Sequence, residues 1–300
     1  MPSPATTCEV PAAYSCLVTG RSRPRVGHID FLNCLPLYDG LVRSGGLLDV
    51  RLRRETPDVL NGLLLAGELD IGPISLVPAL QHAREVVVLP DLAVGSHGPV
   101  LSVVLVSTRP VEDLDGAHIA LGSTSRTSVL LAQMLLAQRY ELKASFVTTP
   151  PDLGAMLRIA DAAVLIGDPA LRATYEAPAM GLHVLDLGAA WREWTGLPMV
   201  FAVWAARRDY ARDHPDQVAA VQRSFRASLT ASLARVEEVA ADAARWEPFD
   251  AATLATYFQA LDFRLGRRQQ AGIAEFTRRA ALLGAVPEDA VLDLALVSEP

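Results

Sequence analysis

Short apolar runs alternate with longer segments of helical periodicity along most of the 300-residue chain. The runs are rich in Val and Ile and are bounded by Gly, Pro or Asp, which is typical of strands buried on both faces. The longer segments repeat Leu and Ala every three or four positions, as amphipathic helices do. This alternation predicts mixed, mostly parallel sheets flanked by helices, and therefore an α/β fold.

The predicted elements follow one another in a regular order. Strands are predicted over residues 25–29, 69–75, 85–90, 99–106, 117–122, 144–148, 161–167, 183–187 and 197–206. Helices are predicted over residues 57–66, 128–140, 152–160, 213–244, 252–261 and 269–283.

Two long apolar strands, over residues 100–107 and 198–206, bracket a complete α/β unit and are expected to be the crossovers between two lobes. The predicted parts are a disordered extension over 1–24, a first lobe of 25–104 plus 203–300, and an inserted second lobe over 105–202. Ligands of such sheets bind beyond the carboxyl ends of strands, where loops converge. We therefore expect the functional residues in loops that directly follow strands, facing a cleft between the lobes.

Composition narrows the class of partner. Hydrophobic residues make up 51% of the chain, enough for a large core, and the formal charge of −7 argues against a nucleic-acid partner. No run of about 20 apolar residues predicts a membrane span. The first 24 residues lack the pattern of a signal peptide, and the three cysteines, Cys8, Cys16 and Cys34, form no CxxC pair. These features predict a cytoplasmic protein without a disulfide framework.

The loop after the first predicted strand contains Asn33, whose amide can donate and accept hydrogen bonds and so orient a hydroxyl or carboxylate. Its alternative role is to cap the following helix. Cys34 beside it is interpreted as a packing residue. Ser75 ends another strand and either contacts a ligand or caps the next helix, whereas Ser102 interrupts an apolar strand and needs a partner if buried.

A Ser/Thr-rich stretch directly after a strand opens a helix, and it consists of Gly122, Ser123, Thr124, Ser125, Arg126 and Thr127. Glycine permits close approach of the backbone, and the amides of a first helical turn favour an anion, to which the hydroxyls add donors. The spacing is not that of a P-loop. We expect a carboxylate site here, the alternative being a helix cap without a ligand.

Another strand leads into Ile166, Gly167 and Asp168. Asp168 could accept a hydrogen bond from a ligand hydroxyl or act as a base, but it could equally cap the helix that Pro169 begins. The six histidines show no HxxxH or HExxH spacing, so no metal site is predicted. No nucleotide or nucleophile-elbow motif is present either.

Several of these segments together resemble the chorismate dehydratase family of the futalosine route to menaquinone. The matching segments are VGHIDFLNCLPLY, GELDIGPISLVPAL, GPVLSVVLVS, ALGSTSRTSVLLAQ, AAVLIGDPAL and WTGLPMVFAVWAARRDY. The resemblance begins near Arg25 and runs to the end of the chain. It implies a type II periplasmic-binding-protein-like fold and conversion of chorismate to 3-[(1-carboxyvinyl)oxy]benzoate and water without a cofactor.

The resemblance also implies roles for individual residues. Asn33 matches the asparagine of the family's LNC motif and looks like a catalytic or orienting residue, and Ser102 matches a serine in the cleft. The segment from Ser123 to Thr127 matches the carboxylate-binding helix start, and Gly167 with Asp168 matches a ligand-contacting motif. Ser75 stands where threonine is also found. We expect the proton to be taken by the substrate's own side-chain carboxylate, with Asp168 as the alternative base.

Two other functions fit the same pattern. One is a non-catalytic protein that binds a small carboxylate, and the other is a 1,4-dihydroxy-6-naphthoate synthase, for which a histidine base in the cleft is expected. In each case the partner is a small molecule, with neither nucleic acid nor membrane, and the protein is a monomer or a homodimer.

Overall fold

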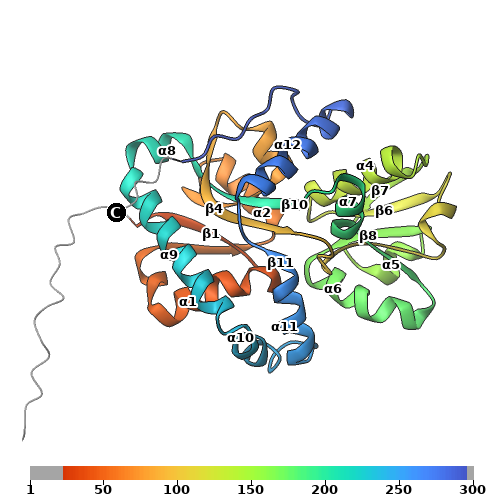
Figure 1. The fold of residues 1–300 in the computed structure, drawn as a ribbon, viewed down its shortest axis with the longest axis horizontal. Coiled ribbons are helices and arrows are strands. Elements are labelled where there is room, and N and C mark those ends of the chain that lie inside the picture. Colours follow the sequence, from red (N-terminus) through yellow and green to blue (C-terminus); the bar gives the residue numbers. More distant parts are fainter. Residues whose placement is uncertain (1–22, 296–300) are drawn as a thin grey trace, which may run out of the picture.

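The computed structural model of the chain describes residues 23–295, so the predicted extension lies almost wholly outside the described residues. The fold is α/β, as the pattern predicted, and comprises two sheets, each with helices against it (Figure 1). The predicted strands are all present, together with two that were not predicted. Among residues 23–295, no helix is both long and apolar enough to cross a membrane.

The first sheet has six strands in the order β11-β4-β10-β3-β1-β2. Their bounds are β1 (Arg25–Ile29), β2 (Arg51–Glu55), β3 (Ile71–Ser75), β4 (Val86–Ser96), β10 (Met199–Arg207) and β11 (Leu261–Asp262). β1 runs parallel to β2 and β3, whereas β10 is antiparallel to β3 and β4. The sequence RLRRE of β2 carries four charges, and for that reason it gave no apolar signal.

The second sheet has five strands in the order β7-β6-β8-β5-β9. Their bounds are β5 (Val103–Ser107), β6 (His118–Gly122), β7 (Ser145–Thr149), β8 (Ala162–Ile166) and β9 (His183–Asp186). β6 is parallel to β7 and β8, and β5 is antiparallel to β8 and β9. Both sheets are therefore mixed, with more antiparallel pairs than the alternation of strands and helices suggests.

Helices cover both sheets. Those associated with the first sheet are α1 (Leu35–Ser44), α2 (Pro57–Leu65), α3 (Leu76–Gln81), α8 (Arg208–Asp213), α9 (Pro215–Leu233), α10 (Val236–Ala243), α11 (Ala251–Ala260) and α12 (Arg267–Leu282). Those associated with the second are α4 (Thr127–Met134), α5 (Leu153–Leu157), α6 (Gly167–Glu176) and α7 (Leu187–Thr195). Short helical turns are η1 (Leu32–Cys34), η2 (Gly46–Asp49), η3 (Val111–Asp113), η5 (Ala177–Met180) and the π-helix η4 (Leu135–Arg139).

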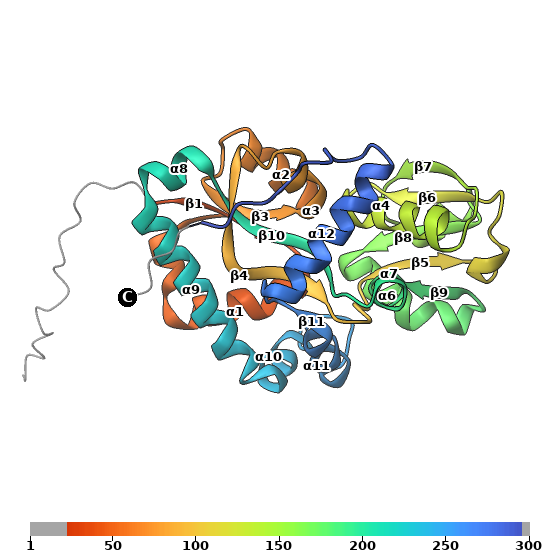
Figure 2. The same ribbon diagram turned by 45° about the horizontal axis from the view of Figure 1, so that its top comes forward.

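The expected crossover strands are β5 and β10, and each pairs within one sheet only. The chain passes between the sheets just before each of them, so β5 belongs to the second sheet and β10 to the first. The division into lobes at residues 105 and 202 stays a prediction. Figure 2 shows α12 running along β10 toward α4, which it contacts, so the helix bridges the two sheets.

One buried apolar cluster extends through both sheets. It includes Trp204 of β10, which is fully buried and packs against Phe225 of α9, and Trp191 of α7, whose indole NH donates to the carbonyl of Pro198 over 3.2 Å. A smaller cluster lies within the second sheet and its helices. Because the larger cluster includes residues of both sheets, the loops that face each other between them are held by shared packing.

Candidate functional site

The loop after β1 meets the start of α6 from the other sheet. The amide of Leu32 donates to Oδ1 of Asp168 over 3.0 Å. Burial raises the pKa of Asp168 to about 6, the hydrogen bond from Leu32 opposes the shift, and the nearby charges of Glu247 and Asp30 add to it. The carboxyl group predicted to contact a ligand or cap a helix thus joins the two sheets and titrates near neutral pH.

Gly167 packs directly against the same loop. Its φ of +66° lies in the left-handed region, and a Cβ there would approach the ring of Phe31 to 2.9 Å. Its amide donates to the carbonyl of Ser102 over 2.8 Å. Only glycine allows both the backbone conformation and the close contact, so the loop after β1, the start of β5 and the start of α6 meet at this point.

Asn33 lies within this junction, in η1, and is partly buried. Its Oδ1 is buried and has no hydrogen-bond partner in the described part of the chain. A buried amide oxygen usually has a partner, because leaving it without one costs about 1–3 kcal/mol. An unpaired acceptor at this place is suited to a ligand that brings a donor.

Ser102 and Tyr257 form the second polar element of the junction. Ser102 is 1% exposed, and its hydroxyl makes only a long hydrogen bond, 3.4 Å, to the carbonyl of Val100. The hydroxyl of Tyr257, from α11, lies near that of Ser102, but no hydrogen bond of normal geometry joins them. Tyr257 is not among the residues predicted from the sequence, because in the segment ATLATYFQAL it has the pattern of an ordinary core residue.

Ser75 and Thr127 mark a second contact between the sheets. The hydroxyl of Ser75 accepts a hydrogen bond from Nδ2 of Asn61 over 3.2 Å, and its amide donates to Oδ1 of Asn61 over 2.9 Å. Thr127 begins α4, and its buried hydroxyl accepts from the amide of Val77 over 3.0 Å. The first turn of α3, directly after β3, and the start of α4 are therefore bonded to each other. Nothing in the sequence indicated that Asn61, in the middle of α2, hydrogen-bonds to Ser75.

The segment before α4 remains partly open to solvent. Ser123 and Arg126 are exposed, and Thr124 and Ser125 are partly buried. The hydroxyl of Ser125 accepts from the amide of Ser128 over 3.2 Å, which is a local helix-start bond. Arg126 pairs with Asp58 of α2 over 3.2 Å. The residue at the N-cap of α4 is Arg126, whose side chain makes no cap hydrogen bond, so the hydroxyl groups of Ser123 and Thr124 are left available as donors.

The strand register brings these segments to one edge of the second sheet. β6 and β8 are parallel neighbours, with Leu121 opposite Val164, so Gly122 at the end of β6 lies beside the end of β8. A Cβ on Gly122 would approach the carbonyl of Val164 to 3.1 Å. Ile166 ends β8 directly before Gly167. In the first sheet, β1 and β3 are likewise parallel neighbours whose carboxyl ends carry Asn33 and Ser75.

A pocket of about 400 Å³ opens beside Asp168. Its lining includes His28, Arg54, Tyr38 and Trp246. The ring of His28 stacks on that of Tyr38 with centroids 3.5 Å apart, and its buried Nδ1 has no partner among residues 23–295. Burial, helped by Arg54, lowers the pKa of His28 to about 4, so the imidazole is neutral at pH 7.

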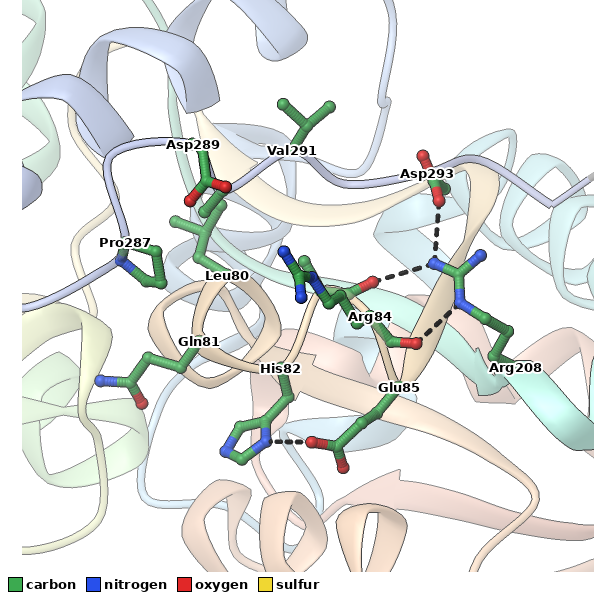
Figure 3. A pocket seen from close by; sticks show the side chains of 12 residues that line it. Leu80, Gln81, His82, Arg84, Glu85, Arg208, Pro287, Asp289, Val291 and Asp293 are labelled. Carbon is green, nitrogen blue, oxygen red and sulfur yellow. Dashed lines mark hydrogen bonds and ion pairs between the residues drawn. The ribbon is translucent and has the colours of Figure 1, made fainter.

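A larger pocket, of about 560 Å³, lies away from the predicted residues (Figure 3). It is enclosed by the end of α3, the turn before β4 and the segment 287–293. Four of its charged side chains form two pairs: His82 contacts Glu85 over 2.9 Å, and Arg208 contacts Asp293 over 2.8 Å. Since none of the predicted residues lines this pocket, we place the candidate site at the junction between the sheets.

Most of the predicted residues there are neutral donors and acceptors, and Asp168 is the carboxyl group among them. Cys34 is fully buried, and burial raises the pKa of its thiol far above the usual range, which agrees with its interpretation as a packing residue. Over residues 23–295, no group of three His, Cys, Asp or Glu side chains is placed to hold a metal ion.

Known proteins resemble this chain in sequence and in structure. The chain is 31% identical over 270 residues to the chorismate dehydratase of Thermus thermophilus, covering 84% of this chain and 93% of that protein. It is 30% identical over 258 residues to a 1,4-dihydroxy-6-naphthoate synthase of Streptomyces coelicolor, covering 84% and 89%.

Solved structures show the same fold. Protein AF1704 of Archaeoglobus fulgidus superposes with a TM-score of 0.71 at 20% identity, covering 88% of this chain and 98% of that one. The periplasmic aliphatic sulphonate binding protein of Escherichia coli superposes with a TM-score of 0.63 at 19% identity, covering 92% and 94%. The fold is therefore that of the periplasmic binding proteins, as expected. The sequence profile of a family described as menaquinone biosynthesis matches residues 24–282, and the chain belongs to that family.

Proposed function

We propose that this protein is a chorismate dehydratase, a hydro-lyase that converts chorismate to 3-[(1-carboxyvinyl)oxy]benzoate and water. The observation that carries the proposal is the unpaired, buried Oδ1 of Asn33, on the loop that the Leu32–Asp168 hydrogen bond joins to the start of α6. The similarity to the Thermus thermophilus chorismate dehydratase over most of both chains supports it.

The proposed reaction depends on how the substrate is positioned more than on a strong base or acid from the protein. Chorismate loses the proton on its ether-bearing ring carbon and the neighbouring hydroxyl, and the ring becomes aromatic, so the products are favoured. As the proton leaves, negative charge spreads toward the ring carboxylate. Fixed hydrogen-bond donors around that carboxylate stabilise the charge as it develops. The exposed and partly buried hydroxyls of Ser123, Thr124 and Ser125 are the donors we assign to this role.

Asn33 has the orienting role in this proposal. Its amide oxygen accepts a hydrogen bond from the ring hydroxyl of the substrate and fixes its direction, while the Ser102 hydroxyl and the backbone of Ile166 and Gly167 border the ring. The proton taken from the ring carbon passes to that hydroxyl, which leaves as water when its bond to the ring breaks. Holding the reacting groups in one geometry removes much of the entropic barrier of the reaction.

We assign proton abstraction to the substrate's own side-chain carboxylate and a positioning role to Asp168. One oxygen of Asp168 accepts the hydrogen bond from Leu32. That bond fixes the loop that carries Asn33. With a pKa of about 6, Asp168 is mostly ionised at neutral pH, so it also remains the protein group that could take a proton.

The test is to incubate the purified protein with chorismate and follow ultraviolet absorbance, with mass analysis of the product. We expect an aromatic product lighter than chorismate by one water molecule. The control is Asn33→Ala, which should slow formation of that product by at least about 100-fold, the usual range for losing a preorganised group. Unchanged chorismate with the unaltered protein would contradict the proposal.

The second candidate is a 1,4-dihydroxy-6-naphthoate synthase, because a protein of that name is nearly as similar in sequence. His28 is the histidine that this alternative would use, since it lines the pocket that also reaches Asp168. The same incubation separates the candidates: neither this synthase nor a binding protein without chemistry would convert chorismate. The cytoplasmic location predicted from the sequence belongs to the proposal of a biosynthetic enzyme.

A further inference from the structure

Tyr257 presents a polar group with no structural explanation. It belongs to α11, is 0% exposed, and its ring packs near that of Phe258 with centroids 5.8 Å apart. Its hydroxyl has no hydrogen-bond partner within the part of the chain that the structure describes. A tyrosine buried in a core normally finds a partner for its hydroxyl, and phenylalanine would fill the same space without an unpaired group.

The surroundings of that hydroxyl are the predicted site. Burial raises the pKa of Tyr257 well above its usual range; the neighbouring hydroxyl of Ser102 opposes the shift, and Asp168 and Cys34 are near enough to add to it. The phenol therefore stays protonated at neutral pH and is a donor rather than a base. α11 is far in sequence from the loops after strands, yet its tyrosine reaches the residues that those loops bring together.

Three polar groups here lack a good partner at the same junction. They are Oδ1 of Asn33, the hydroxyl of Tyr257 and the hydroxyl of Ser102, whose own hydrogen bond is 3.4 Å long. They come from three separate elements, η1, α11 and the segment before β5. One unpaired group could be a packing compromise. Here the hydroxyls of Tyr257 and Ser102 are neighbours, and Asn33 lies on the loop bonded to Asp168, whose charge also acts on Tyr257. This grouping indicates a polar ligand at the junction.

We propose that the hydroxyl of Tyr257 donates a hydrogen bond to an oxygen of the bound substrate, beside Ser102, and so is a further substrate-binding residue. This inference rests on the proposed function for the identity of the substrate. We assign the bond to a carboxylate oxygen that substrate and product share, so it forms with both. Its loss should weaken binding more than it slows turnover.

The test compares Tyr257→Phe with the unaltered protein. Binding of 3-[(1-carboxyvinyl)oxy]benzoate is measured by calorimetry, KM for chorismate by the absorbance assay, and Tm without ligand by thermal unfolding. We expect Kd and KM to rise about 10-fold or more, kcat to change little, and Tm without ligand to stay equal or rise. The matched control is Tyr210→Phe, since Tyr210 donates to Gln217 in the first lobe and should leave Kd and KM unchanged.

Three outcomes would overturn the inference. Unchanged Kd and KM in Tyr257→Phe would mean that the hydroxyl does not touch the ligand, although turnover of chorismate by the unaltered protein would still uphold the proposed function. A lower Tm without ligand would mean that the hydroxyl has a structural partner. A fall in kcat with unchanged binding would exclude the binding role. If the unaltered protein neither binds the product nor consumes chorismate, the proposed function fails and this inference fails with it.

Discussion

The amide of Leu32 donates a hydrogen bond to Oδ1 of Asp168 over 3.0 Å, although the two residues are 136 positions apart in the chain. The bond joins the loop after β1, in the first sheet, to the start of α6 against the second. Asn33 directly follows Leu32, so the position of its side chain depends on this contact. The carboxyl group of Asp168 thus controls both the geometry and the local charge of the site.

Asp168→Asn should keep most of the turnover. An asparagine oxygen still accepts from the Leu32 amide, so we expect kcat for chorismate within about 3-fold of the unaltered protein, whereas Asp168→Ala, which removes the acceptor, should raise KM about 10-fold. The measurement is steady-state kinetics of both variants. If Asp168 were instead the base, Asn would be as damaging as Ala, with a loss of roughly 100-fold or more in kcat.

The same carboxyl group makes stability depend on pH. The pKa of Asp168 is about 6 in the folded protein and ordinarily 3.8. Between pH 3.8 and about 6, the carboxyl group is therefore mostly protonated in the folded protein and mostly ionised in the unfolded chain. The contribution of Asp168 to the free energy of unfolding is therefore largest below pH 4 and is lost as the pH rises through about 6. Asp168→Asn should gain stability relative to the unaltered protein over that range, by up to about 3 kcal/mol. Urea unfolding of both proteins at pH 4 and pH 7 measures this, and a difference that does not vary with pH contradicts it.

Gly167→Ala should disturb the junction more than an ordinary glycine substitution. An added Cβ meets the ring of Phe31 at 2.9 Å on a backbone with φ of +66°. Gly181→Ala is the matched control, because its φ is +73° but no heavy atom of the described chain lies within 4 Å of the added Cβ. We expect Gly167→Ala to lose about 1–3 kcal/mol more than the control in urea unfolding, and to raise KM. Equal losses of stability in the two variants would show that the loop carrying Phe31 can move aside without a cost in free energy.

Thr127→Val tests the contact between the start of α4 and the first turn of α3. The substitution keeps the shape but leaves the buried amide of Val77 without its acceptor, which costs about 1–3 kcal/mol. Thr127→Ser keeps the hydroxyl, so its free energy of unfolding should fall clearly less than that of Thr127→Val. Chemical denaturation gives the free energy of unfolding of each variant. A serine variant as unstable as the valine variant would point to the lost methyl group rather than the hydrogen bond.

Apolar and helix-start patterns within single strands and helices predicted much of the fold. The apolar run AAVLI before Gly167 is almost wholly buried, and it lies where the apolar pattern predicted a strand, as β8. Pro57 likewise marked the start of α2. Arg51–Glu55 escaped prediction, because an edge strand with mostly exposed side chains has no apolar pattern to reveal it. Its strand form depends on pairing with β1, which a local pattern cannot show.

Periodicity and motifs were enough to predict the fold class, the family and the segments in which the candidate residues lie, because both are properties of neighbouring positions. Three-dimensional packing, in contrast, brings Asp168 to Leu32, Asn61 to Ser75 and Tyr257 to Ser102. These relations join residues from different helices, strands and loops. They arise when the elements pack against one another in three dimensions, and contacts made by that packing leave no repeat or spacing in the chain.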